Sequence, residues 1–192
     1  MPIRRPTIQN NFDQNKDSSL VPLILAIRVT PRKISSGHFN KKGTKEKKLT
    51  LSAFDILEKH IELLDAGKNS VFFSTGCNID FTKIPQIKRV LFFNVSEGIY
   101  VICKANIYRK TDGTQYIPDN ALPELQVDIW RNQPEKTWIQ IFSYEQIFDT
   151  SVFRKYPLLT THTQNGYKNL EDLLLNGKRF NFAYAKYLHN KI

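Results

Sequence analysis

The stretch RVLFFNVSEGIYVICKANIYRK, residues 89–110, decides the predicted fold. Two runs rich in β-branched and aromatic residues, RVLFFNV and GIYVICKANIYRK, flank the turn NVSEG at residues 94–98. Apolar runs on either side of a short glycine-containing turn predict a β-hairpin. SVFFS at 70–74 and TWIQIFSY at 137–144 predict two further strands. The hairpin is therefore expected to lie within an antiparallel sheet.

Two segments ahead of the hairpin also have clear patterns. LVPLILAIRV, residues 20–29, is apolar at nearly every position, which predicts a strand buried on both faces. TLSAFDILEKHIELLDAGK, residues 50–68, has the 3.6-residue period of a helix, with Ser52 and Asp55 as a capping box at its start. Its predicted apolar face consists of Leu51, Phe54, Leu57, Ile61 and Leu64. His60 adjoins that face, and we expect it to be a structural histidine and not a catalyst.

Together these segments predict an α+β fold, a small antiparallel curved β-barrel with flanking helices. Residues 20–160 are expected to form the barrel domain, after a flexible polar arm at residues 1–19. Residues 161–192 are expected to be a helical tail packed on the barrel. This tail contains a short leucine-rich helix at 170–174 and a second helix at 180–189.

The charge of the chain points to its partners. Its 192 residues carry a formal net charge of +10, and an excess of this size favours polyanions such as DNA or RNA. Positive charge is concentrated in the loop at 30–48, where only Glu46 is acidic. The basic residues of this loop are Arg32, Lys33, Lys41, Lys42, Lys45, Lys47 and Lys48. The loop is either a solvated connector or a phosphate-binding arm, and Arg109, Lys110 and Arg131 are further phosphate-binding candidates.

Sequence signatures of catalysis are weak. There is no P-loop, GxGxxG, HExxH or GxSxG pattern. The only Glu-x-Lys, at residues 46–48, falls in the basic loop and not on a strand, which leaves a divergent nuclease as a minor alternative. Cys77 and Cys103 lack CxxC spacing, so we expect no zinc site and no cofactor. No membrane span or secretory signal is recognisable, so the expected location is the cytoplasm.

The stretch NSVFFSTGCNIDF, residues 69–81, is the strongest candidate for a binding pocket. An aromatic wall followed by hydrogen-bonding groups suits a planar ring that must be stacked and read at its edge. Its candidate residues are Phe72, Phe73, Ser74, Thr75, Asn78 and Asp80. Adjacent strand residues point to opposite faces, so at most one of the two phenylalanines lines the pocket. Asp80 has the alternative role of capping a turn.

Three further aromatic residues are candidates for the same pocket. Trp130 is the best stacking candidate, because it lies in an irregular segment at 111–135 and beside a basic residue. Trp138 lies on a predicted strand, where a core position is the commoner role. Tyr144, near the end of that strand, completes the set.

Three segments together resemble a known class of module. They are ILEKHIELLDAGKNSVFFS (56–74), IKRVLFFNVSEGIYVICKANIYR (87–109) and PEKTWIQIFSYEQI (134–147). Their arrangement resembles PUA-like modules and, within them, the EVE group of modified-base readers found in modification-dependent restriction systems. The resemblance implies a strand that ends in a small polar turn at a pocket, inside a curved barrel. This chain has Phe72 and Phe73 where the related readers often show tryptophans.

The predicted function is non-catalytic recognition of nucleic acid. The resemblance implies that a modified base, for example a methylated one, is flipped from duplex DNA into an aromatic pocket. The protein would act alone or with a nuclease or NTPase encoded elsewhere. Two alternatives remain open: an RNA-binding protein of the same fold, and a basic interaction or inhibitor protein that binds an acidic protein partner.

Overall fold

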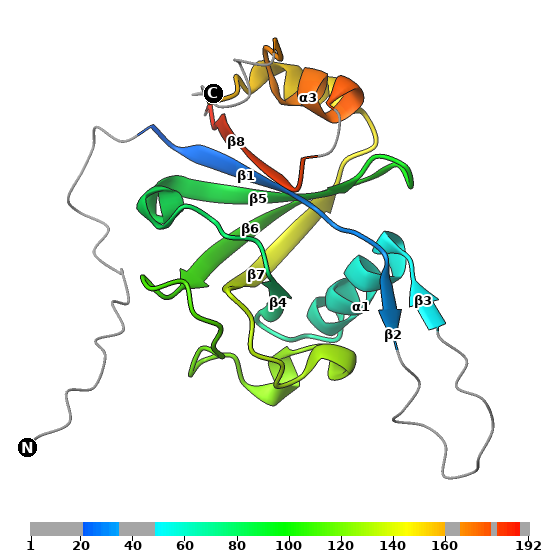
Figure 1. Ribbon diagram of the computed structural model, residues 1–192. Coiled ribbons are helices and arrows are strands. Elements are labelled where there is room, and N and C mark those ends of the chain that lie inside the picture. Colours follow the sequence, from blue (N-terminus) through cyan, green and yellow to red (C-terminus); the bar gives the residue numbers. More distant parts are fainter. Residues whose placement is uncertain (1–20, 35–48, 160–165, 178–179, 189–192) are drawn as a thin grey trace, which may run out of the picture.

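The computed structural model describes residues 21–34, 49–159, 166–177 and 180–188 (Figure 1). The main sheet contains β1 (Leu23–Arg28), β4 (Val71–Thr75), β5 (Ile87–Asn94), β6 (Ile99–Arg109), β7 (Thr137–Gln146) and β8 (Phe182–Lys186). A separate ribbon consists of β2 (Arg32–Ile34) and β3 (Leu49–Leu51). The helices are α1 (Ala53–Asp65) and α3 (Leu170–Asn176), with short 3-10 turns η1 (Phe81–Gln86), η2 (Pro123–Leu125), η3 (Asp128–Trp130) and η4 (Thr150–Lys155). The predicted arm at 1–19 and most of the predicted basic loop lie outside the described residues.

The main sheet is open and mixed, which corrects the predicted antiparallel barrel. Its strand order is β4-β7-β6-β5-β1-β8, with β4 and β8 at the two edges. β1 runs parallel to β5, because the chain crosses over through β2, β3, α1 and β4 before it returns to the sheet. All other pairs in the main sheet are antiparallel, including the predicted β5–β6 hairpin. The predicted α+β class is therefore confirmed, whereas the predicted closure of the sheet into a barrel is wrong.

The gap on the concave side of the sheet is filled by the chain that follows β4. Ile79 is fully buried there, and the backbone N–H of Asp80 donates to the hydroxyl of Tyr184 on β8 at 2.8 Å. This contact joins the segment after one edge strand to the other edge strand. The loop therefore takes the place that direct β4–β8 pairing has in a closed barrel.

Helix α1 covers the concave face with a different stripe from the predicted one. Ala53, Ile56, Leu57 and His60 are buried, whereas Phe54 is 49% exposed. The cap was predicted correctly, because Ser52 accepts from the N–H of Asp55 and that aspartate accepts from the N–H of Ser52. The cap sets where the helix begins, but the sheet beneath the helix selects the face that is buried.

The convex face has two covers. Around β1, β5 and β8 it packs against η4 and α3, whose Leu170, Leu173 and Leu174 are buried as the sequence suggests. Around β4 and β7 it packs against the irregular segment at 111–135. The second predicted tail helix, at 180–189, is wrong: β8 lies in the middle of that segment and pairs with β1. Every second residue from Phe180 to Tyr184 is aromatic, which is the two-residue period of a strand. In the described part of the chain, no helix is long and apolar enough to cross a membrane.

Candidate functional site

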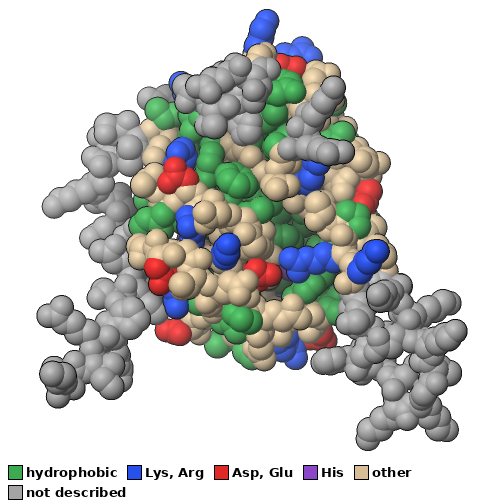
Figure 2. Space-filling view, viewed as in Figure 1, with side chains coloured by type: hydrophobic (Ala, Val, Ile, Leu, Met, Phe, Trp, Pro, Cys, Tyr) green, Lys and Arg blue, Asp and Glu red, His purple; other side chains and the backbone are tan. Residues whose placement is uncertain are grey.

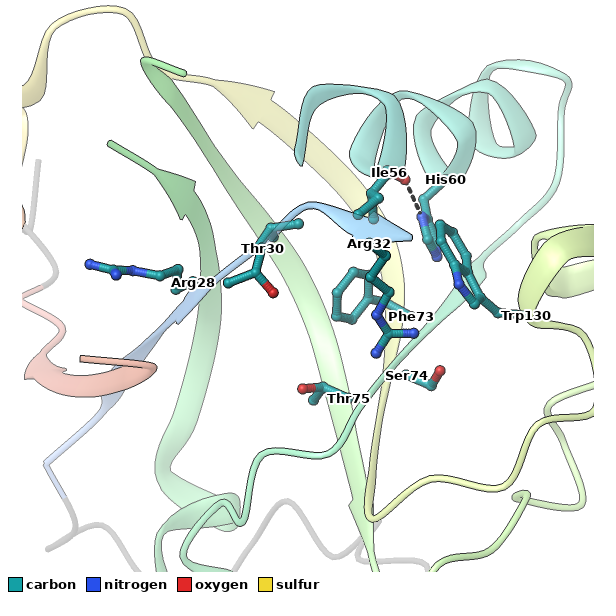
Figure 3. Close-up of a pocket in the computed structure, with 10 residues that line it drawn as sticks. Arg28, Thr30, Arg32, Ile56, His60, Phe73, Ser74, Thr75 and Trp130 are labelled. Carbon is teal, nitrogen blue, oxygen red and sulfur yellow. Dashed lines mark hydrogen bonds between the residues drawn. The ribbon is translucent and has the colours of Figure 1, made fainter. Parts of the chain in front are cut away.

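A hollow opens on the concave side, between the end of β1, the start of α1 and the end of β4 (Figure 3). Its lining comes from five separate parts of the chain: Arg28, Val29 and Thr30 at the end of β1, Arg32 on β2, Ile56 and His60 on α1, Phe73, Ser74 and Thr75 on β4, and Trp130 on η3. We call this site the hollow. Figure 2 shows hydrophobic surface in this region with Lys and Arg side chains beside it.

Four of these side chains contact one another in series. The Arg32 guanidinium carbon lies 5.9 Å from the centre of the Trp130 ring. Trp130 stacks on His60 with centroids 5.5 Å apart and an interplanar angle of 12°. His60 in turn contacts Phe73 at 5.1 Å, and Phe73 continues into the core. The indole is therefore partly buried against the core, with His60 stacked on it and a partly exposed guanidinium nearby.

His60 is a neutral member of this series. Its Nδ1 lies 2.6 Å from the carbonyl oxygen of Ile56, which can only accept, so Nδ1 carries the proton. Burial lowers the pKa of His60 from 6.5 to about 4, against the opposing effect of that hydrogen bond. The nearby positive charge of Arg32 lowers the pKa further. At neutral pH its Nε2 therefore carries a lone pair and not a proton.

The polar rim of the hollow comes from the end of β4. Ser74 and Thr75 line it, as the sequence predicts for the turn after the aromatic wall. The Thr75 hydroxyl accepts from the N–H of Cys77 at 3.2 Å, which leaves its own proton free to donate. The hollow thus combines an aromatic face with hydroxyl groups that can meet the edge of a ring.

Three predicted pocket residues lie elsewhere. Phe72 and Trp138 are buried on the convex face, and the Trp138 Nε1–H donates to the carbonyl oxygen of Tyr116 at 2.6 Å. Tyr144 lies at the other end of its strand, where its hydroxyl is 3.0 Å from the carboxylate of Asp65. Of the two adjacent phenylalanines, only Phe73 lines the hollow, as strand alternation predicts. Trp138 lies in the core, which is the commoner role for a tryptophan on a strand.

Asn78 and Asp80 stabilise the loop after β4 and do not line the hollow. The Arg109 guanidinium donates to the Asn78 side-chain oxygen and to the carbonyl oxygen of Ile79. Asp80 caps η1 by accepting from the N–H of Thr82 at 3.0 Å. Hydrogen bonds from Lys83 and then Thr82 lower the pKa of this aspartate to about 2. Asp80 therefore has the alternative role named above, that of a turn cap, and is not a pocket residue.

The predicted phosphate-binding residues are only partly free to bind an anion. Arg109 is engaged as described, Arg131 pairs with Asp128, and Lys110 lies 5.3 Å from the Tyr116 ring centre. Arg32 lies at the hollow and Lys33 is exposed beside it on β2. The remaining candidates, Lys41, Lys42, Lys45, Lys47 and Lys48, lie outside the described residues. β2 and β3, which precede and follow these lysines in the sequence, pair with each other, and Arg32 on β2 lines the hollow.

Sequence reasoning missed Arg28, Val29, Thr30 and Ile56 as lining residues. A signal was available for the first three, because they lie at the end of a strand that is predicted to be buried on both faces. The Arg28 side chain points away from the other labelled residues and lies over the rings of Phe93 and Phe180 (Figure 3). The hollow therefore gains a charged side chain from Arg32 rather than from Arg28.

The hollow is small. It offers about 50 Å³ to the centres of water-sized molecules, which is room for a few waters. In the described part of the chain, no group of three or more His, Cys, Asp or Glu side chains is placed to hold a metal ion. Comparison with protein-family models, with curated proteins and with solved structures finds no match for this chain.

Proposed function

We propose that this chain is a non-catalytic nucleic-acid-binding protein that reads one modified base of DNA in the hollow. The observation that carries the proposal is the placement of Trp130, which lines the hollow, stacks on His60 and is only partly buried. An indole held in this way is a stacking platform for a planar base. Ser74 and Thr75 supply hydroxyl groups at its edge.

Charge beside the hollow supports the same proposal. Arg32 and Lys33 lie on β2, at the base of the ribbon that leads into the lysine-rich segment at 35–48. Lysine and arginine around the mouth of a base pocket neutralise the phosphates that flank a flipped nucleotide. Stacking and phosphate contacts thus come from adjacent parts of one structure.

The resemblance to PUA-like modules is compatible with this arrangement. The three segments that carry the resemblance form α1 with β4, the β5–β6 hairpin, and β7, and these strands lie in one sheet. β4 ends in small polar residues at the rim of a hollow, as the resemblance implies. We propose on this basis that the chain is a member of the PUA-like class with an open sheet.

Base entry requires Arg32 to leave Trp130, because the hollow as it stands holds only a few waters. Two weak contacts hold this arginine: the cation–π contact with the indole and a 3.9 Å approach to Glu135. Its side chain is 41% exposed, so both contacts are worth on the order of 1 kcal/mol. Base stacking at about 1–3 kcal/mol is sufficient to displace the guanidinium, which then lies near the flanking phosphates.

The proposal is tested by fluorescence anisotropy with a panel of nucleic acids. The panel contains plain duplex DNA, duplexes with methylcytosine, hydroxymethylcytosine or methyladenine, and a structured RNA, each at two salt concentrations. The expected result is at least a tenfold preference, about 1.4 kcal/mol, for one modified duplex. A preference for the RNA indicates the RNA-binding alternative. Equal, salt-sensitive binding to every probe contradicts base reading and directs the search to an acidic protein partner.

Three substitutions locate the pocket. Trp130→Ala is expected to remove the preference while leaving weak, salt-sensitive binding, because the stacking platform is lost and the cations remain. Tyr144→Ala is the matched control, since it removes an aromatic side chain that lies outside the hollow. Asn78→Ala is also expected to keep the preference, because Asn78 contacts Arg109 and not the hollow. If Trp130→Ala retains full discrimination, the base is bound elsewhere.

A further inference from the structure

Glu135 places a carboxylate at the edge of the hollow. Its backbone is fixed by two hydrogen bonds with Tyr116, of 3.0 and 3.2 Å. One carboxylate oxygen lies 3.9 Å from the Arg32 guanidinium, and the other lies 3.6 Å from the point where a Cβ on Gly76 would stand. Gly76 directly follows Thr75, so this carboxylate borders the polar rim of the hollow.

The carboxylate of Glu135 is poorly satisfied. Its side chain is only 20% exposed, and in the described part of the chain no group donates a hydrogen bond to either of its oxygens. Burial of a charge is costly unless the charge is paired and hydrogen-bonded. The nearby cation is the Arg32 guanidinium, which must leave when a base enters. A ligand that takes the place of Arg32 therefore has to supply a hydrogen-bond donor to Glu135.

The guanidinium of Arg32 indicates which kind of group suits this position. It is planar and carries N–H donors on a conjugated carbon, and it lies both 5.9 Å from the indole centre of Trp130 and beside the carboxylate. Figure 3 shows it pointing from β2 towards Ser74 and Thr75. The exocyclic amino group of a base is likewise an N–H donor in the plane of a conjugated ring. Such a base can contact the same indole and the same carboxylate as the arginine.

We propose that the hollow selects bases that carry an exocyclic amino group, and that Glu135 is the residue that accepts from this group. This inference rests on the proposed function. Cytosine and adenine each present an amino donor beside a ring-nitrogen acceptor, whereas thymine presents a carbonyl oxygen beside an N–H. The carboxylate can only accept, and the hydroxyl of Thr75 has a free proton to donate. This pair matches the amino bases, whereas the carbonyl oxygen of thymine would face the carboxylate with no donor between them.

The test compares probes that contain an amino base with probes that contain its keto counterpart. The pairs are methylcytosine with thymine, hydroxymethylcytosine with hydroxymethyluracil, and methyladenine with hypoxanthine. Each base is placed in a short single-stranded oligonucleotide, so that the energy of unpairing does not differ between probes. The wild type is expected to bind the amino member of the pair that it recognises at least tenfold more tightly. This comparison needs no substitution, so a folding defect in a variant cannot obscure it.

Glu135→Gln is expected to reduce that preference to less than about threefold. The amide that it introduces can accept through its oxygen and can also donate to a carbonyl oxygen. The ratio of the two affinities is the readout, because the loss of a negative charge strengthens binding to all anionic probes alike. Glu124→Gln is the matched control, since it removes the same charge from an exposed position in the same irregular segment and should leave the ratio unchanged.

The outcomes separate this inference from the proposed function. A wild type that distinguishes modified from plain duplexes, but binds amino and keto bases equally, overturns the inference and leaves base reading intact. A preference for the amino base that Glu135→Gln retains assigns the contact to another residue and also overturns the inference. A wild type with no preference for any modified duplex overturns both.

Discussion

Phe72 and Phe73 show what a single residue contributes to this site. They are neighbours on β4, yet Phe73 contacts His60 at the hollow and Phe72 contacts Trp138 on the convex face. Strand alternation predicts this separation, but not which of the two faces the hollow. That choice depends on α1 and Trp130, which are distant in sequence and cover the concave face only.

His60 is expected to make folding stability depend on pH. Its pKa is about 4 in the folded protein and 6.5 in the unfolded chain, so the unfolded chain binds more protons between these values. The stabilisation is complete above pH 6.5 and is lost as the pH falls towards 4, by about 3 kcal/mol in total. The measurement is urea denaturation of the wild type and of His60→Phe from pH 4 to pH 7. A stability difference between the two proteins that does not change over this range contradicts the assignment.

The start of α1 shows how one element depends on a distant one. Both oxygens of Glu97, in the β5–β6 turn, accept at 3.0 Å from the backbone N–H groups of Ala53 and Phe54. Asn94 holds the same turn by accepting from the N–H of Glu97 and donates to the carbonyl oxygen of Val29 at 2.9 Å. The hairpin turn therefore links the first turn of the helix to the end of β1, on two sides of the hollow.

Glu97→Gln is expected to lower the free energy of unfolding by about 1 kcal/mol. A carboxylate that accepts from free N–H groups at a helix start stabilises it through hydrogen bonds and through the helix dipole, and the amide loses one acceptor and the charge. Chemical denaturation measures the change. Glu58→Gln, at an exposed position within the same helix, is the matched control and should change stability by less than half as much. Equal effects of the two substitutions indicate a general charge effect and no cap.

The curvature of the sheet positions the parts of the hollow. β4 and β8 are its two edges, and the loop after β4 contacts β8 through Asp80 and Tyr184. Arg109 holds the same loop from β6. Because this loop follows Ser74 and Thr75 directly, the contacts that fill the gap in the sheet also fix the polar rim.

Tyr184→Phe is expected to cost about 1 kcal/mol of folding stability, because the N–H of Asp80 loses its acceptor in a part-buried position. The measurement is chemical denaturation combined with hydrogen exchange at the Asp80 amide, which should become faster. Tyr167→Phe is the control, since its hydroxyl makes only an exposed 3.3 Å hydrogen bond. An unchanged exchange rate at Asp80 contradicts a role for Tyr184 in holding the loop.

The sequence by itself determined the elements whose signals are local. The β5–β6 hairpin, β1, and the capping box of α1 follow from turn chemistry, apolar runs and side-chain spacing within a few residues. It also indicated that a core position is the commoner role for Trp138, which is buried. Only the tertiary structure decided the parallel pairing of β1, the open sheet, and β8 in place of a helix. It also separated Asn78 and Asp80 from the hollow and placed Arg32 and His60 within it. These features depend on contacts between segments that are far apart in the chain, and such contacts leave no periodic pattern in any one of them.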